Sequence, residues 1–207
     1  MSATPTIVEN ASSDQIADWL SERIGQRLAS RSAPVAITVP GGATPFPILE
    51  RLVERGVAMD RLLVWSNDDR EVAEDHEASN TGRIRRLLEP AGAEVVTLSI
   101  MEQVPRFDLV WLGMGADGHI ASLFPNTDPT VDDTQRIRRV TPDPLPPDAP
   151  FNRITLTLPA LLNSDEIVFV IKGEDKRAVF DAAAAGENDL PVARLLAAAT
   201  QPVTCFA

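Results

Sequence analysis

The stretch VAITVPGGATPFPILERLVERG, residues 35–56, predicts a strand, a turn and a helix in immediate succession. Its first five residues form an apolar, β-rich run, and Gly41 and Gly42 then allow the backbone to turn sharply. The apolar side chains between Ile48 and Val53 fall on one face of a helix, which we expect to end near Gly56. A strand followed by a helix is the repeating half of a parallel α/β sheet.

The same unit recurs along the chain. The apolar runs RLLVW (61–65), FDLVWLG (107–113) and EIVFVIKG (166–173) are followed by polar loops or helical patterns, and VTCF (203–206) predicts a last strand. Nearly continuous apolar strands between amphipathic helices indicate a parallel sheet that is covered on both faces. We therefore predict a Rossmann-like, doubly wound α/β fold with a mostly parallel sheet, forming one domain over residues 1–207.

The helices of this fold have recognisable ends. Ser12 and Gln15 have the form of a capping box before an amphipathic helix that runs to Ser30. A second helix is expected near residues 79–89, and the helix beginning with EDKRAVF should be closed by Gly186. The proline-rich segment TPDPLPPDAP (141–150) cannot be a helix or a central strand, so we expect a surface loop there.

Composition and charge limit the possible partners. Apolar residues make up 44% of the chain and charged residues 24%, as in globular proteins that bury a core. The formal net charge of −11 argues against nucleic acid or an anionic membrane as a partner, because both reward clustered Lys and Arg. An anionic small substrate is compatible with this charge only where a few cations are concentrated locally.

The sequence also favours a cytoplasmic protein. Cys205 is the single cysteine, so no internal disulfide can form. The first residues, MSATPTIVEN, have neither the basic start nor the apolar run of a secretion signal. No segment approaches the roughly 20 apolar residues that span a bilayer.

Ligands of open parallel sheets bind beyond the carboxyl ends of the strands, so polar loops in those places are candidate sites. In the first such loop, residues 39–47, Gly41 and Gly42 permit close approach of a ligand to the backbone, and Thr44 with Pro45 suits the cap and first turn of a helix. The N–H groups at this helix start would favour a phosphate. An ordinary strand-to-helix turn explains the same residues, and the loop matches neither a dinucleotide fingerprint nor a P-loop.

A second loop, residues 66–80, places Asp68, Asp69 and Arg70 directly after a strand. Charged runs usually form a solvated surface, but these residues lie where ligands bind. A charge-assisted hydrogen bond contributes about 1.5–3 kcal/mol, against about 0.3–1 kcal/mol for a helix terminus, and the fork of Arg70 can grip two phosphate oxygens. Lys176 is a candidate second cation, with Lys172 and Arg177 as competitors.

The third loop, LGMGADGHIASLFP (112–125), contains one of two histidines, His119, close to Asp117. It is either a glycine-rich structural turn or the site of a proton carrier, since histidine titrates near neutrality and a positioned base contributes about 10²- to 10⁴-fold in rate. We expect no metal site, because no cysteine or HExxH-type spacing accompanies His76 and His119. Ser122 lies outside any G-x-S-x-G elbow, which disfavours a serine hydrolase.

Taken together, these motifs resemble the 6-phosphogluconolactonase family. The resemblance rests on PGGATP, DDR with DHEASN, LGMGADGHIASLFP and RITLTLPALLNSDEIVFVIKGEDK, in this order and over nearly the whole chain. The Gly-Asp-Gly-His loop is shared with the related glucosamine-6-phosphate deaminases, which continue with a Phe-Asn-Glu-Pro type of sequence. Residues 121–125 instead read ASLFP, as in the lactonases.

The resemblance implies a carboxylic ester hydrolase of carbohydrate metabolism. Its reaction would be hydrolysis of 6-phospho-D-glucono-1,5-lactone to 6-phosphogluconate, in the oxidative pentose phosphate pathway, without a metal or organic cofactor. His119 matches the catalytic base, which would take a proton from water and return it to the ring oxygen, while Asp117 would orient it. Backbone N–H groups of the glycine loops would stabilise the oxyanion.

The resemblance also implies which residues bind the substrate. Arg70 and Lys176 match the phosphate-binding cations, and Gly41, Gly42 and Thr44 match the phosphate loop. Asp68 and Arg153 are further substrate-binding candidates, although an arginine that starts a strand can equally be structural. We expect His119 and Arg70 to face opposite ends of one phosphorylated sugar ring.

Two residues depart from the family pattern, and two other functions remain open. Ala43 replaces the usual serine and Asp69 replaces the common glutamate, so both changes bear on affinity rather than on the type of reaction.

The alternatives are a glucosamine-6-phosphate deaminase or isomerase and a non-catalytic sugar-phosphate sensor.

Overall fold

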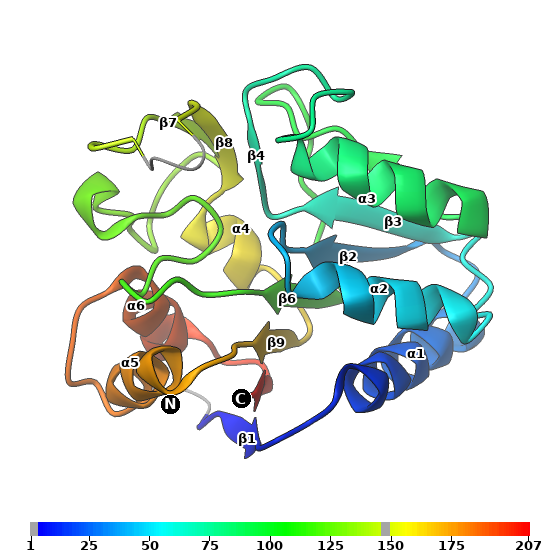
Figure 1. Ribbon diagram of the computed structural model, residues 1–207, viewed down its shortest axis with the longest axis horizontal. Helices are drawn as coiled ribbons and strands as arrows, with labels where there is room; N and C mark the ends of the chain where they lie inside the picture. Colours follow the sequence, from blue (N-terminus) through cyan, green and yellow to red (C-terminus); the bar gives the residue numbers. More distant parts are fainter. Residues whose placement is uncertain (1–3, 146–149) are drawn as a thin grey trace.

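The protein is a doubly wound α/β structure in which one large sheet is covered by helices on both faces (Figure 1). The computed structural model describes residues 4–145 and 150–207. The large sheet has the strand order β1-β10-β9-β6-β2-β3-β5, and every neighbouring pair in it is parallel. Its strands are β1 (Thr6–Val8), β2 (Val35–Val39), β3 (Leu62–Ser66), β5 (Glu94–Val96), β6 (Leu109–Leu112), β9 (Ile167–Val170) and β10 (Val203–Phe206). The predicted Rossmann-like fold is confirmed.

The helices divide between the two faces of this sheet. One face packs against α1 (Ser13–Ser30), α2 (Pro45–Glu54) and α3 (Asn80–Leu88). The other packs against α4 (Leu158–Leu162), α5 (Glu174–Ala184) and α6 (Pro191–Ala198). Because successive side chains of a strand point to opposite faces, each strand contributes to both cores, which explains the continuous apolar runs.

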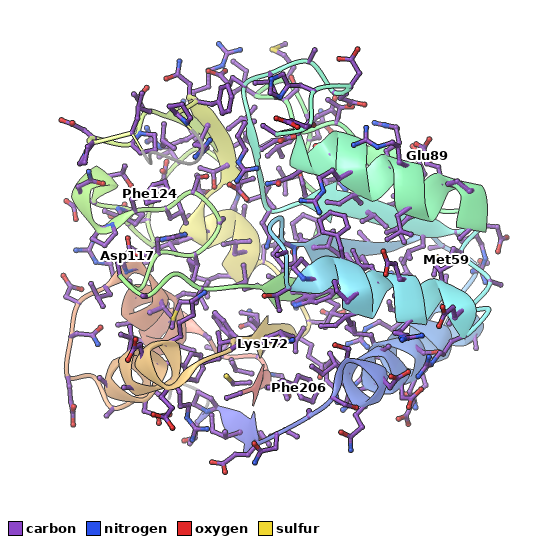
Figure 2. All side chains as sticks on the ribbon, in the orientation of Figure 1. Met59, Glu89, Asp117, Phe124, Lys172 and Phe206 are labelled. Carbon is purple, nitrogen blue, oxygen red and sulfur yellow. The ribbon has the colours of Figure 1, made fainter. Side chains whose placement is uncertain are left out.

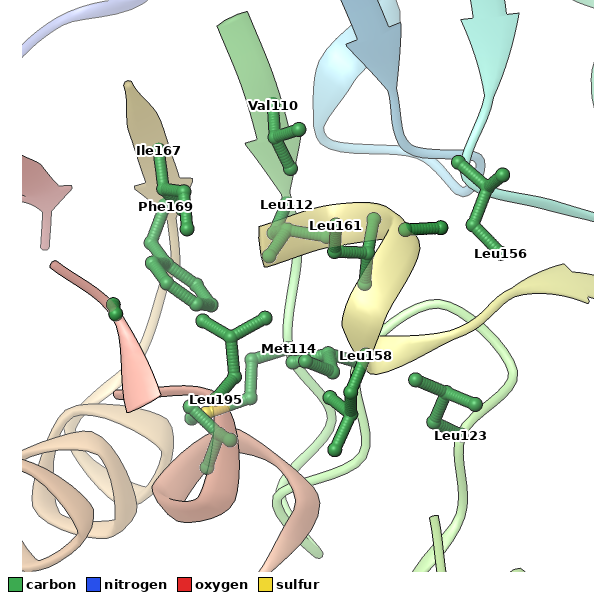
Figure 3. Close-up of a cluster of buried hydrophobic side chains, with 14 of the residues drawn as sticks. Val110, Leu112, Met114, Leu123, Leu156, Leu158, Leu161, Ile167, Phe169 and Leu195 are labelled. Atoms are coloured by element: carbon green, nitrogen blue, oxygen red, sulfur yellow. The ribbon is translucent and has the colours of Figure 1, made fainter. Parts of the chain in front are cut away.

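Strand β6 shows this alternation most directly. Leu109 and Trp111 belong to the core beneath α1 and α2, whereas Val110 and Leu112 belong to the core beneath α4 and α6. Figure 3 shows Val110 and Leu112 along β6, with Leu161 of α4 beside Leu112, and Leu112 is paired in register with Phe169 of β9. All of these side chains are nearly or fully buried, and each contributes about 1.5–3 kcal/mol of transfer free energy.

The predicted helix ends agree with the structure. Ser12 and Gln15 form the expected capping box of α1, and α2 begins with Pro45 in its first turn. Gly56 and Gly186 follow their helices with φ angles of 66° and 73°, in the left-handed region that favours glycine. None of the helices in the described ranges is both long and apolar enough to cross a membrane.

A second, antiparallel sheet was not expected. It consists of β4 (Asp68–Arg70), β8 (Arg153–Leu156) and β7 (Ile137–Val140), in the order β4-β8-β7. Strand β4 follows β3 after the single residue Asn67, so the chain leaves the large sheet at its carboxyl edge and at once pairs with β8. This small sheet therefore forms a wall beyond the carboxyl ends of the parallel strands.

The proline-rich loop is described only in part. Residues 141–145 form neither helix nor strand, as predicted, while residues 146–149 lie outside the described part of the chain. Two short helical turns, η1 (Glu89–Ala91) and η2 (Pro125–Thr127), follow α3 and the His119 loop respectively.

Candidate active site

The loops that follow β2, β6 and β9 surround one cavity with the small sheet. Its volume of about 410 Å³ lies in the range of about 300–1,000 Å³ that is usual for small-molecule sites. The predicted residues Gly41, Gly42, Thr44, Asp68, Arg70, His119, Arg153 and Lys176 all line it. In the view of Figure 2, Asp117, Phe124 and Lys172 lie beyond the ends of β6 and β9. The structure thus brings segments more than 100 residues apart into one site.

The His119 ring is fixed from one side by Asp117. Its Nδ1 lies 2.6 Å from Asp117 Oδ1, and the His119 backbone N–H donates to the same oxygen over 3.2 Å. The hydrogen bond to His119 is the main cause that holds the pKa of the Asp117 carboxyl below its usual range. The carboxylate thus occupies Nδ1 and leaves Nε2 as the nitrogen available for proton exchange.

The turn that carries His119 is held closed by its own backbone. The N–H of Gly115 donates to the His119 carbonyl over 3.0 Å, and the N–H of Gly118 donates to the Gly115 carbonyl over 3.1 Å. Gly118 has a φ of 78°, which glycine adopts without strain. Because both N–H groups are used inside the turn, they are not available to an oxyanion, contrary to our expectation for these two glycines.

Two distant segments anchor this loop. The N–H of Val192, in the first turn of α6, donates to the Gly118 carbonyl over 3.2 Å. The N–H of Ser122 donates to Thr155 Oγ1 of β8 over 3.2 Å. The residue between His119 and Ser122 in the cavity wall, Ala121, has a φ of 49°, an uncommon conformation for a residue with a Cβ atom.

Arg70 is positioned by the start of α3. Its Nη1 donates to the Ala78 carbonyl over 2.8 Å and to Asn80 Oδ1 over 3.2 Å. Nε is buried without a hydrogen-bond partner among the described residues. The guanidinium is therefore held in place through Nη1, whereas Nη2 is neither hydrogen-bonded nor fully buried within the described part of the chain, so it can serve a ligand.

Asp69 has a structural role and does not line the cavity. Its carboxylate accepts hydrogen bonds from the backbone N–H groups of Arg70, Asn80 and Thr81 and from the Ser79 hydroxyl, over 2.7–3.0 Å. Three of these donors lie at the N-terminus of α3, where a carboxylate is favoured by the helix dipole. The departure from glutamate at this position thus bears on how the start of α3 and the backbone of Arg70 are held, and it reaches the Arg70 guanidinium only through them.

Asp68 lies at the wall of the cavity, next to Arg70 and across from β8. Its Oδ2 accepts a hydrogen bond from the Ser122 hydroxyl, which links β4 to the His119 loop. Burial raises the pKa of Asp68, and the Ser122 hydrogen bond and the charge of Arg70 oppose this effect only in part. The sequence around Ser122 gives no signal for this partner, because Asp68 lies 54 positions away in the chain.

Arg70 and Arg153 are direct cross-strand neighbours in the pairing of β4 with β8. Arg153 is 3% exposed, and burial together with the nearby Arg70 charge lowers its pKa. Like charges placed opposite one another are unfavourable, so an anion between them would relieve their repulsion. Arg153 lines the cavity and is also the first residue of β8, so the two roles considered for it from the sequence are compatible.

The loop after β2 presents backbone donors to the cavity. The N–H groups from Gly41 to Thr44 donate to no residue in the described ranges, and α2 begins directly behind them. Thr44 makes no side-chain capping bond, which corrects our expectation, and its side chain lies in the cavity wall instead. A Cβ atom on Gly41 would lie 2.1 Å from Asn80 Oδ1, so glycine here leaves room for the residue that holds Arg70.

Among the competing cations, Lys172 and Lys176 line the cavity and Arg177 does not. Arg177 instead pairs with Asp181 and Glu9. His76, the second histidine, also lies outside the cavity, where its Nδ1 accepts a hydrogen bond from the Ala78 N–H.

The cavity is electropositive although the chain as a whole is acidic. Four cationic side chains line it, Arg70, Arg153, Lys172 and Lys176, against the single carboxylate of Asp68. A larger hollow of about 1130 Å³ near α5 and α6 is lined instead by four aspartates and one arginine. Only the first of these two cavities suits an anionic ligand.

Residues 8–98 and 89–204 match the family described as glucosamine-6-phosphate isomerases/6-phosphogluconolactonase. The chain belongs to this family. A curated relative named 6-phosphogluconolactonase from Mesorhizobium japonicum is 32% identical over 92% of this chain and 88% of its own. Another of that name, from Pseudomonas aeruginosa, is 34% identical over 86% of each chain.

Solved structures of family members share the fold. The crystal structure of a 6-phosphogluconolactonase from Shewanella baltica has a TM-score of 0.83 at 26% identity, over 98% of this chain and 97% of its own. A monomeric glucosamine-6-phosphate deaminase has a TM-score of 0.76 at 14% identity, over 97% of this chain and 96% of its own. The second match shows that the architecture by itself does not separate the two activities of the family.

Proposed function

We propose that this protein hydrolyses 6-phospho-D-glucono-1,5-lactone to 6-phosphogluconate. The observation that carries the proposal is the shared cavity, in which a histidine with a carboxylate partner and four cationic side chains meet. Family membership and the names of the curated relatives point to the same reaction. The sequence ASLFP after His119 favours the lactonase branch over the deaminase branch.

The phosphate of the substrate would bind between Arg70, Lys176 and the loop after β2. Arg70 offers a planar set of donors, and the N–H groups from Gly41 to Thr44 add neutral donors at a helix start. Without a serine hydroxyl at Ala43, the backbone and Thr44 provide the remaining contacts. Each charge-assisted hydrogen bond contributes about 1.5–3 kcal/mol, so a few such contacts account for selective binding of the phosphorylated sugar.

His119 would act as the general base through Nε2. It takes a proton from a water molecule as the water oxygen attacks C1 of the lactone, and the Asp117 carboxylate stabilises the resulting imidazolium. The tetrahedral intermediate then collapses, the bond between C1 and the ring oxygen breaks, and the imidazolium returns the proton to that oxygen. The carboxylic acid product ionises at neutral pH, so each turnover releases one proton.

In this proposal the reaction needs neither a metal nor an organic cofactor. Every step uses a side chain in the cavity wall or its direct neighbour Asp117. Treatment with a chelator followed by gel filtration should therefore leave the rate unchanged, and a loss that added divalent metal restores would contradict this part of the proposal.

The decisive experiment measures proton release from freshly prepared 6-phosphogluconolactone, corrected for spontaneous hydrolysis. We expect wild-type protein to accelerate the release and His119→Ala to lose about 10²- to 10⁴-fold in kcat while it still binds 6-phosphogluconate. Equal rates for the two proteins would refute the assigned base. Ammonia release from glucosamine 6-phosphate without lactone hydrolysis would identify a deaminase, and product binding without any turnover would identify a sensor.

A further inference from the structure

The two lysines of this sequence, Lys172 and Lys176, both lie in the wall of the candidate active site. Every other residue among the 19 Lys and Arg residues is an arginine. The chain therefore presents its side-chain amines in one place, and that place is the cavity for which a lactone is proposed as substrate.

The local structure keeps both amines available. Lys172 follows β9, Lys176 lies in the first turn of α5, and Gly173 between them has a φ of 99°. Neither lysine forms a hydrogen bond or an ion pair within residues 4–145 and 150–207, whereas the adjacent Arg177 is held by Asp181 and Glu9. Lysine amines can lose their proton and act as nucleophiles, whereas the arginine guanidinium stays protonated.

An aldonolactone is an activated ester, and a neutral amine is a stronger nucleophile toward it than water. After one proton leaves the lysine ammonium to solvent, the amine nitrogen attacks C1, and the bond between C1 and the ring oxygen breaks. The second nitrogen proton passes to that oxygen, which leaves a stable amide and a new hydroxyl group. No oxidant, reductant or further reactant is needed.

We infer that Lys172 and Lys176 form a site of covalent N-acylation by phosphorylated aldonolactones, a side reaction that competes with hydrolysis. The inference rests on the proposed function, because that function places the lactone in this cavity. In the hydrolytic orientation Lys176 contacts the phosphate, so acylation takes a lactone that binds in the same cavity with its ring reversed and C1 toward the amines. Confinement in one cavity raises the effective concentration of the amines toward C1, as in intramolecular reactions. Acylation would replace a cation of the phosphate site by an amide that carries a phosphate group, so the modified cavity would repel the next substrate molecule.

The test is intact-mass and peptide mass spectrometry of the purified protein after incubation with 6-phosphogluconolactone. We expect an adduct of one lactone on the peptides that contain Lys172 or Lys176. Its rate should saturate with lactone concentration and fall in excess 6-phosphogluconate. The α-amino group of the same chain is the internal control, because its acylation should rise linearly and show no protection.

Three variants and one analogue sharpen the result. Lys172→Arg and Lys176→Arg assign the acceptor, and the double variant should retain only the acylation of the α-amino group. Glucono-1,5-lactone, which lacks the phosphate, should acylate the lysines without saturation. No lysine adduct, or lysine acylation that is linear and unprotected like that of the α-amino group, would overturn the inference.

His119→Ala separates this inference from the proposed function. If His119 is the hydrolytic base, the variant should lose turnover and still be acylated at the lysines, because the amines attack C1 without it. If wild-type protein fails to accelerate hydrolysis, the proposed function fails, and the saturation test on the lysines still decides the acylation by itself.

Discussion

Gly115 lies so close to His119 that a Cβ atom in its place would fall 2.2 Å from both Cε1 and Nδ1 of the imidazole. Such atoms do not approach within 3.0 Å in real structures, so an alanine must displace the ring or the turn. We expect Gly115→Ala to lower kcat by about 10²-fold with little change in KM, since a misplacement of about 1 Å can have this effect.

Gly113→Ala, in the same loop as Gly115, is the matched control. A Cβ atom at Gly113 would meet only Pro40 Cβ, at 3.9 Å. Steady-state kinetics of both variants, with thermal melting to verify folding, provide the measurement. Similar kcat values for the two folded variants would show that the ring position fixed by this turn is not needed for turnover.

Asp117→Asn tests the partner of the imidazole. The variant keeps the size of the side chain and removes the charge that stabilises an imidazolium. A hydrogen bond to a charged group contributes about 1.5–3 kcal/mol, so we expect kcat to fall by roughly ten- to a hundredfold. Since pairing with His119 lowers the pKa of Asp117, the carboxylate stays ionised throughout the neutral range, and the loss should be present at every pH from about 6 to 8. An unchanged kcat would remove Asp117 from the mechanism.

Arg70→Ala should act mainly on binding. The lost contacts to a phosphate predict an increase in KM of about ten- to a hundredfold, with a smaller effect on kcat. Asn80→Ala should raise KM less, because the Asn80 side chain holds the Arg70 guanidinium and the Asp68 carbonyl in place and carries no charge for the phosphate, and the two effects should not add in the double variant. Arg86→Ala removes an exposed cation of α3 outside the cavity and should leave KM unchanged. If the two effects on KM add in the double variant, Asn80 acts independently of Arg70.

Asp68→Asn should change how stability depends on pH. Burial raises the pKa of Asp68 above its ordinary value of 3.8, so the folded chain binds this proton more tightly than the unfolded chain. The free energy of unfolding should therefore fall as pH rises from about 4 through the raised pKa and stay lower at neutral pH. The variant should lack this decrease. Urea denaturation across the pH range provides the test, and parallel curves for both proteins would contradict it.

The large sheet could be predicted because its signal is carried by single segments. The runs around Ile37, Val64, Val110 and Phe169 are apolar on both faces, and each is followed by a turn or a helix. The short edge strands β1 and β5 gave no such pattern, since three residues are too few to show a period. Their place is set by pairing with β10 and β3, which is a property of the whole fold.

The small sheet and its part in the site could not be predicted from local sequence patterns. β4 is the charged triplet Asp68–Arg70, which looks like a loop until β8 pairs with it. The contacts of Arg70 with Asn80 and of Asp68 with Ser122 join residues 10 and 54 positions apart, so neither is visible in the spacing of a motif. The sequence therefore predicts the charged and glycine residues of the site. The hydrogen bonds that orient them can be seen only in the folded structure.

The bond from Val192 to the Gly118 carbonyl ties the histidine turn to a helix that begins some seventy residues further along the chain. During translation the turn is therefore completed before this helix and before β9 and β10 are made. A nascent chain can therefore contain every residue of the histidine turn and still lack the helix that holds it. The turn can reach its final conformation only after α6 has been synthesised.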